Sequence, residues 1–229
     1  MIQFYSVSKI YPGSKVEAVK DINLRIKRGE FVFLVGHSGA GKSTILKLIF
    51  REELPTSGQL FFNDKNVVRM RGRDVLALRR RIGMIFQDFR LLPQKTAFEN
   101  VALALEVFGA SQREIRVKVP EVLARVGLLE KAMAYPHQLS GGEQQRVCIA
   151  RAIVKNPLVI LADEPTGNLD PETSRDLMSL LEQINAAGTT IIVATHAWDI
   201  VNEMMKRVVA LDKGRIVRDE EQGSYGYAQ

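Results

Sequence analysis

The sequence predicts an α/β fold: a mostly parallel sheet covered by helices, a smaller antiparallel β layer at the N-terminus, and a helical insertion. Short strands that are apolar on both faces alternate with amphipathic helices, which is typical of a parallel sheet buried between helices. The first 30 residues and residues 59–62 have instead the pattern of an antiparallel layer. No apolar strand occurs between residues 87 and 140, where helix-start patterns occur.

The composition of the 229 residues, 46% hydrophobic and 25% charged, is typical of a globular protein of one or two domains. The longest apolar runs are Phe31–Val35 and Leu158–Ala162, whereas a membrane-spanning helix needs about 20 apolar residues. The start, Met1–Ser6, lacks the layout of a secretion signal. The single cysteine, Cys148, excludes an internal disulfide, favours a reducing compartment, and is expected to be a small buried residue on a helix.

Positive charge is concentrated in one segment. Residues 69–81 hold six arginines and one acid, Asp74, a net +5 of the chain's +6. Such a patch could meet anionic lipid, nucleic acid or an acidic partner, and a solvated helix face is an equally good interpretation. The arginines are Arg69, Arg71, Arg73, Arg79, Arg80 and Arg81.

Four short strands are expected inside the parallel sheet because each is apolar on both faces. They are Phe31–Val35, Ile82–Phe86, Val159–Ala162 and Thr190–Ala194.

The helical insertion is predicted from two capping boxes, Thr96–Glu99 and Ser111–Glu114, in which a hydroxyl and a carboxylate satisfy backbone N–H groups at a helix start. Gly109 and Gly127 are expected to end these two helices. Pro120 falls inside the second helix, which it should kink or restart.

The segment Gly36–Ser43 matches the phosphate-loop pattern G-x-x-x-x-G-K-[ST] in full. A strand, Phe31–Val35, precedes it and a helix, Thr44–Phe50, follows it, as this loop requires. The glycines let successive backbone N–H groups point at the phosphates, and the helix N-terminus adds partial positive charge. Lys42 would reach the outer phosphates and the Ser43 hydroxyl would bind Mg²⁺.

Polar residues follow the other predicted parallel strands, and parallel strands bring their carboxyl ends to one edge. Asp163 and Glu164 would repel each other unless a cation is present, so Asp163 is expected to hold Mg²⁺ through water. Glu164 would then orient and polarise the attacking water. Gln87 and His196 follow two further strands, and taken singly each is an ordinary loop or surface residue.

A second helix-start pattern, Ser140–Glu143, is a capping box with two glycines in its first turn. Each glycine costs about 1 kcal/mol relative to alanine in a helix, which suggests that something approaches closely. A helix N-terminus with a serine hydroxyl is itself an anion site. The chain thus offers two phosphate sites for one nucleotide, and sharing each nucleotide between two copies would resolve the excess.

On these motifs the sequence closely resembles the ABC ATPase family over essentially its whole length. The motifs occur in the family's order: Tyr11 at the adenine-stacking position, Lys42 in Walker A, Gln87 in the Q-loop, Ser140–Glu143 as the signature, Asp163 and Glu164 in Walker B, Asn168–Asp170 as the D-loop and His196 as the switch histidine. Glu143 departs from the glutamine of many members.

The resemblance implies a P-loop NTPase (RecA-like) core in a head-to-tail homodimer that closes on two ATP molecules. The catalytic residues are then Glu164, His196, Gln87 and Lys42, and the Mg²⁺ residues are Ser43, Gln87 and Asp163. The nucleotide contacts are Tyr11, Gly36, His37, Ser38, Gly39, Ala40, Gly41, Lys42, Ser43, Thr44, Ser140, Gly141, Gly142, Glu143 and Asp170. The whole chain, 1–229, is expected to form one ABC ATPase domain. Its core and β layer take residues 1–87 and 157–220, its helical ABC-specific subdomain about 88–156, and a short, loosely held tail 221–229.

Within the family the chain most resembles the FtsE-type ATPases of bacterial cell division, through Ile49–Glu53, Phe86–Pro93 and Arg218–Gly226. This implies an ATPase at the cytoplasmic face of the membrane that moves an integral membrane partner resembling FtsX, with division-ring proteins nearby and wall hydrolysis as the outcome. The alternative is an ATPase of a lipoprotein-release or macrolide-type exporter. Nucleic acid is not expected as a partner, because the chain has one phosphate loop and no heptad run. The residues considered for docking the membrane partner, with core packing as an equal alternative, are Phe89, Leu91, Leu92 and Phe98.

Overall fold

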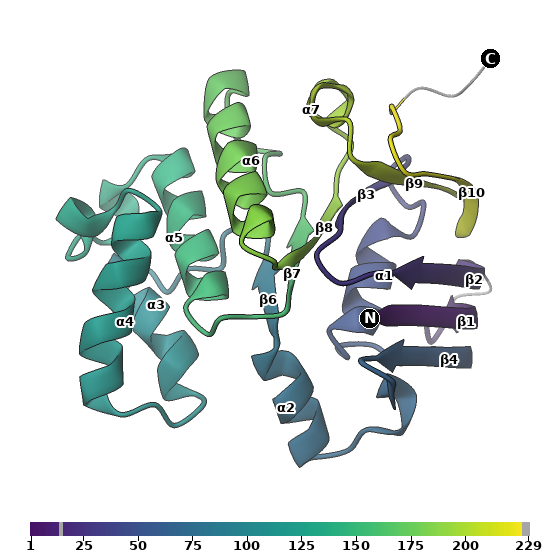
Figure 1. Cartoon of the computed structure of the whole chain (residues 1–229), viewed down its shortest axis with the longest axis horizontal. Helices are drawn as coiled ribbons and strands as arrows, with labels where there is room; N and C mark the ends of the chain where they lie inside the picture. The colour runs from purple at the N-terminus through teal and green to yellow at the C-terminus, as the bar shows by residue number, and fades with distance from the viewer. Residues whose placement is uncertain (14–15, 226–229) are drawn as a thin grey trace.

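The computed structural model describes residues 1–13 and 16–225 of the chain, and Figure 1 shows their arrangement. The larger sheet has six strands in the order β10-β9-β3-β8-β7-β6. All neighbours in it pair in parallel except β10, which is antiparallel to β9. The strands are β3 Phe31–Val35, β6 Ile82–Ile85, β7 Val159–Asp163, β8 Thr190–Ala194, β9 Arg207–Asp212 and β10 Arg215–Glu220.

The four buried strands predicted from the sequence are confirmed, with small shifts at their ends. Strand β6 ends at Ile85 and so excludes Phe86, while β7 continues to Asp163. Helix α1, Lys42–Ile49, begins two residues before the expected Thr44. The lysine of the phosphate loop therefore lies in the first turn of the helix.

The smaller sheet is antiparallel, as predicted, and has the order β2-β1-β4-β5. Ile2 of the central strand pairs with Ile26 on one side and Phe62 on the other. The strands are β1 Ile2–Ile10, β2 Glu17–Ile26, β4 Ser57–Phe62 and β5 Lys65–Asn66.

Two hydrophobic clusters cover the two faces of the larger sheet, and the alternation of side chains along β3 divides them. Val32 and Leu34 join α1 and the smaller sheet in one cluster. Phe31, Phe33 and Val35 face the opposite cluster, which α5 (Gly141–Ile153) and α6 (Pro171–Ala186) help to form. Helix α1 is thus held between the two sheets, and the phosphate loop at its start has a rigid support.

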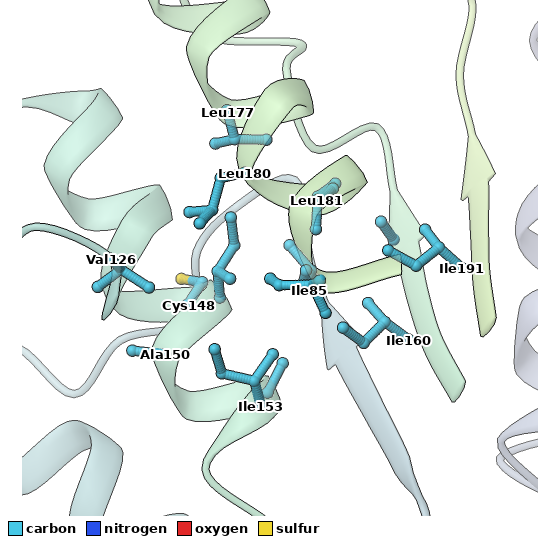
Figure 2. Close-up of a cluster of buried hydrophobic side chains, with 14 of the residues drawn as sticks. Ile85, Val126, Cys148, Ala150, Ile153, Ile160, Leu177, Leu180, Leu181 and Ile191 are labelled. Atoms are coloured by element: carbon cyan, nitrogen blue, oxygen red, sulfur yellow. The ribbon is translucent and has the colours of Figure 1, made fainter. Parts of the chain in front are cut away.

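Figure 2 shows the packing of α5 and α6 on the larger sheet. Ile85, Ile160 and Ile191 project from three neighbouring strands towards these helices. Cys148 of α5 is fully buried in this cluster, which confirms the role expected for it.

The predicted helices of the insertion are present as α3 (Ala97–Glu106) and α4 (Gln112–Arg125), beside α5 in Figure 1. Both capping boxes form, and Gly109 and Gly127 lie just beyond the helix ends at φ +75° and +74°. Helix α4 continues through Pro120, so the restart that the sequence left open is wrong. Ile115, Val119 and Leu123 are buried on both sides of the proline, and their packing holds the helix together despite the missing N–H.

The remaining elements are α2 Arg73–Arg80, α7 Trp198–Met204 and the short 3₁₀ turns Val67–Arg69, Leu129–Lys131 and Pro136–Gln138. In the described ranges, no helix combines the length and the apolar character needed to cross a membrane.

The predicted loose tail, 221–229, extends beyond the described residues, since 226–229 lie outside them. Its described part is held in place, which differs from the prediction. Gly223 is buried and its N–H donates to the Lys206 carbonyl at 3.1 Å. The Tyr225 N–H donates to Asn202 Oδ1 at 2.7 Å.

Candidate nucleotide-binding and ATPase site

A cavity of about 850 Å³ lies at the carboxyl ends of the parallel strands. The edge predicted from the polar residues after the strands is therefore the edge at which the structure opens. The lining residues are Ala18, His37, Ser38, Gly39, Ala40, Gly41, Lys42, Ser43, Thr44, Gln87, Asp163, Glu164, His196, Trp198 and Tyr225.

The phosphate loop wraps tightly because two of its glycines have no room for a side chain. A Cβ on Gly36, at φ +143°, would lie 2.3 Å from the Leu211 carbonyl oxygen. A Cβ on Gly41, at φ +107°, would lie 2.6 Å from the Ala18 carbonyl oxygen. Gly41 is also the N-cap of α1 and supplies no side-chain cap, so the first N–H groups of this helix are free to bind an anion.

The Lys42 ammonium is buried inside the loop. It donates to the carbonyl oxygens of Gly36 at 2.7 Å and His37 at 3.3 Å. It also lies 3.7 Å from Glu164 Oε1. Asp163 also interacts electrostatically with both Lys42 and Glu164, so the three charges influence one another.

Asp163 and Ser43 form the oxygen pair that a cation could use. The Ser43 hydroxyl donates to Asp163 Oδ1 at 2.9 Å. Burial raises the pKa of the Asp163 carboxyl, the Ser43 hydrogen bond partly offsets this, and the neighbouring Glu164 charge raises it further. A nearby cation would relieve both the burial and the repulsion.

The donor set fits Mg²⁺ in a site completed by a ligand. Hydroxyl and carboxylate oxygens are the ligands this ion prefers, with phosphate and water as the rest. Among the described residues there is no cluster of three or more His, Cys, Asp or Glu that could hold a metal by itself. The protein thus offers part of a coordination shell and leaves the remainder to nucleotide and solvent.

Glu164 is fixed in a strained backbone conformation beside His196. Its φ is +48°, and its N–H donates to the Ala194 carbonyl at 2.8 Å. Its Oε2 lies 2.9 Å from His196 Nδ1 and accepts the His196 backbone N–H at 3.2 Å. The carboxylate is therefore held at one oxygen by the histidine and faces Lys42 with the other.

Gln87 reaches the cavity from the end of β6, and the segment after it is strained. Phe89 and Arg90 have φ of +55° and +49°. Arg151 of α5 donates to the carbonyl oxygens of both, at 2.7 Å and 2.6 Å. The Cys148 thiol also lies 3.1 Å from the Phe89 carbonyl oxygen. Helix α5 therefore holds the backbone carbonyls of Phe89 and Arg90, just after Gln87, through these contacts.

Of the four residues considered for docking a partner, three are partly buried against the cluster that α5 and α6 help to form, namely Phe89, Leu91 and Phe98. Leu92 is the most exposed of them at 39%.

The signature residues do not line the cavity of their own chain. Ser140 caps α5 in the predicted capping box with Glu143. A Cβ on Gly142 would lie 2.4 Å from Thr173 Cγ2, so this glycine has a packing reason within the chain, which sequence reasoning left unexplained.

Asp170 and Tyr11 also lie outside the lining residues. Asp170 is the N-cap of α6, and hydrogen bonds from Thr173 lower the pKa of its carboxyl. The Tyr11 hydroxyl lies 3.4 Å from Thr44 Oγ1, and Lys9 Nζ lies 5.0 Å from the centre of its ring.

Sequence reasoning missed Ala18, Trp198 and Tyr225 as lining residues. Trp198 follows His196 by two positions, so its closeness to the site was available as a signal. Tyr225 and Ala18 reach the cavity only through tertiary packing, and no local pattern indicates them.

The chain matches the family described as "ABC transporter" over residues 19–167. It is 58% identical to the "Cell division ATP-binding protein FtsE" of Mycobacterium tuberculosis over 99% of this chain and 98% of that protein. The protein of the same name from Bacillus subtilis is 55% identical, with 99% of each chain covered. The one from Escherichia coli is 48% identical over 94% of this chain and 97% of that one.

Solved structures agree with this. A dimeric, post-hydrolysis ATP-binding cassette bound to ADP and phosphate superposes with a TM-score of 0.88 at 38% identity, covering 98% of this chain and all of that one. A dimeric bacterial ABC transporter cassette gives the same TM-score at 39% identity, with the same coverage. These findings confirm the P-loop NTPase fold, and the chain belongs to the ABC transporter family as one of its nucleotide-binding ATPases.

Proposed function

We propose that this chain is the ATP-binding and hydrolysing subunit of an FtsEX-like complex that acts in bacterial cell division. The observation that carries the proposal is the cavity, where the phosphate loop, Asp163, Glu164 and His196 meet at one edge of the sheet. The identity of 48–58% to relatives named for cell division supports the cellular role.

The phosphates of ATP bind the loop backbone and the N-terminus of α1. Lys42 then exchanges its contacts with the Gly36 and His37 carbonyls for the outer phosphate oxygens. His37 and Lys42 both line the cavity, so Lys42 lies beside the space that the phosphates would occupy.

Mg²⁺ would be held by the Ser43 hydroxyl, by Asp163 through water and by Gln87, and it would neutralise charge on the β- and γ-phosphates. The ion would supply a counter-charge to Asp163 and so would offset the effect of burial, which raises the pKa of this carboxyl.

Glu164 orients and polarises the attacking water. The water oxygen forms a bond to the γ-phosphorus and gives up its proton towards Glu164, from which the proton passes to the released phosphate or to solvent. The bond from phosphorus to the bridging oxygen breaks, giving ADP and phosphate. His196 positions Glu164 through the 2.9 Å contact. It also lines the cavity, where it would contact the γ-phosphate.

Two copies would share each nucleotide in a head-to-tail homodimer. Ser140, Gly141 and Gly142 do not line the cavity of their own chain, and a helix N-terminus with a serine hydroxyl suits a phosphate. The two solved cassettes with the same fold are dimers. In this arrangement Tyr11 stacks on the adenine, while Glu143 and Asp170 act at the shared interface.

Residues 88–156 form the helical subdomain in this proposal, and the groove beside Gln87 docks an integral membrane partner resembling FtsX. The chain then works at the cytoplasmic face of the membrane, and dimer closure is passed on to division-ring proteins and wall hydrolases. An exporter of lipoprotein-release or macrolide type remains the alternative, since it would use the same ATPase chemistry.

The test is to express Glu164→Gln in cells, purify it with ATP from solubilised membranes, and identify the proteins that come along. Glu121→Gln, an exposed change on α4 away from the cavity, is the matched control. Enrichment of an FtsX-like membrane protein over the control supports the division role. Enrichment of a different permease supports the exporter alternative, and full turnover by Glu164→Gln refutes the role given to Glu164.

A further inference from the structure

The structure divides the six arginines of residues 69–81 into two kinds. Arg79 is used inside the protein: its guanidinium donates to the carbonyls of Phe50 and Arg51 and lies over the Phe50 ring. Arg80 donates to the Phe108 carbonyl at 2.9 Å. These two arginines join α2 to neighbouring elements.

The other four arginines are exposed and have no side-chain hydrogen bond or ion pair to any described residue. Asp74, the single acid of the segment, is exposed as well and forms no ion pair there. Elsewhere several exposed arginines are paired, as Arg175 is with Glu203. The four unpaired arginines, here called the basic surface, are Arg69, Arg71, Arg73 and Arg81.

The basic surface is not part of the nucleotide site. Helix α2 ends at Arg80, immediately before β6 begins at Ile82, whereas the cavity lies at the opposite, carboxyl ends of the strands. Figure 1 shows α2 at one extremity of the molecule, beyond the amino end of β6. Nucleotide binding therefore does not account for these charges.

The shape and chemistry of the surface fit a broad layer of anions. Leu76 is 55% exposed on the outer face of α2, between Arg73 and Arg80 along the helix. The hollow that Asp74, Ala77 and Arg81 help to line measures about 50 Å³ and is too small to seat a peptide segment. Arg73 lies one helical turn before Leu76 on α2, and exposed basic residues next to an exposed apolar residue are typical of protein surfaces that contact anionic membranes.

We propose that Arg69, Arg71, Arg73 and Arg81, with Leu76, contact anionic lipid headgroups of the membrane. This rests on the proposed function, because a membrane partner is what brings the chain to a lipid surface. Near an anionic surface each basic residue contributes about 1 kcal/mol, which is about fivefold in binding.

The test compares binding of the full chain to vesicles of phosphatidylglycerol and phosphatidylcholine with binding to vesicles of phosphatidylcholine alone. Arg71→Gln/Arg73→Gln should weaken binding to the anionic vesicles about 30-fold. Arg113→Gln/Arg116→Gln on α4 is the control, since it removes two exposed, unpaired arginines and the same charge. An equal loss in the control, or no loss in the first pair, overturns the proposal.

Other anions separate the lipid from its competitors. Binding to the vesicles should fall steeply in 0.5 M salt, where the Debye length is about 4 Å. Tighter binding to duplex DNA or to polyglutamate than to the anionic vesicles, lost in the Arg71/Arg73 variant, would assign the surface to nucleic acid or to an acidic protein and refute the lipid. Leu76→Gln should weaken binding to the anionic vesicles and leave binding to duplex DNA and to polyglutamate unchanged.

ATP hydrolysis is measured on every variant in parallel. None of these residues lines the cavity, so hydrolysis should stay at the rate of the unmodified chain. A variant that loses vesicle binding but keeps full ATP hydrolysis supports the role of the basic surface and leaves the ATPase mechanism unaffected. A chain that binds vesicles but does not hydrolyse ATP would instead contradict the proposed ATPase mechanism.

Discussion

Replacing Arg151 should uncouple α5 from the segment after Gln87. The guanidinium makes two hydrogen bonds, at 2.7 Å and 2.6 Å, to the carbonyls of Phe89 and Arg90, both in the left-handed region. Hydrogen bonds to a charged group contribute about 1.5–3 kcal/mol each, and the lower value applies because Arg151 is only half-buried. Arg151→Ala should therefore lower the free energy of unfolding by about 3 kcal/mol.

Urea denaturation of the nucleotide-free chain measures this directly, and in thermal unfolding it corresponds to roughly 6–12 °C. Arg151→Lys keeps the charge but loses the planar fork, so it should cost about half as much. Arg175→Ala, which removes a surface ion pair with Glu203, is the control and should cost less than about 1 kcal/mol.

Arg151→Ala and Arg151→Lys should also lower kcat for ATP hydrolysis while nucleotide affinity stays constant. Arg151 does not line the cavity, and it acts through the position of Gln87. A loss of stability below about 1 kcal/mol in Arg151→Ala would refute the reasoning. Equal losses in the alanine and lysine variants would refute the role given to the bidentate contact.

Three further outcomes are expected. Glu164→Gln should abolish turnover but keep nucleotide binding, which fluorescence of the single tryptophan, Trp198, can follow because that residue lines the cavity; loss of binding would contradict the role. Burial and, after it, the Arg80 charge lower the pKa of Lys155 to about 8. The folded chain therefore releases this proton before the unfolded chain does, so stability should rise by about 1 kcal/mol between pH 7.5 and 9, and the rise should be absent in Lys155→Met. Burial raises the pKa of the Cys148 thiol to about 12; a thiol reagent should label it about 1000-fold more slowly in the folded chain than in urea, and equal rates would contradict its burial.

The parts of the fold that the sequence predicts are those with a local cause. Strands such as Phe31–Val35 and Thr190–Ala194 are apolar on both faces because helices cover both sides of the sheet, so their pattern is visible in five residues. The capping boxes at Thr96 and Ser111 satisfy backbone groups within one turn. The effect of Pro120 has no such local cause, because whether a helix continues through a proline depends on tertiary packing.

The site divides in the same way. The phosphate loop and Glu164 follow from motifs at strand ends, and the structure places them on one cavity. Tyr225 arrives from the tail by contacts with α7 and cannot be read from its neighbours in sequence. The sequence around Gly142 also does not show why a glycine is needed there. Thr173, which leaves no room for a Cβ on this residue, lies 31 positions further along the chain.

Helix α5 connects the signature residue Ser140 with Arg151, which contacts the segment after Gln87. Its N-terminus carries Ser140, which would meet the nucleotide of a second copy, and Arg151 lies eleven residues further on. That separation is about 16 Å along a helix whose buried face packs against the sheet. Because α5 is one continuous helix, we expect a displacement of Ser140 by a nucleotide bound to a second copy to shift Arg151 and its hydrogen bonds to the carbonyls of Phe89 and Arg90. Because those residues are held in a sparsely populated backbone conformation, releasing the Arg151 contact would let the segment relax. We therefore expect the strained segment next to Gln87 to change its backbone conformation when the dimer closes.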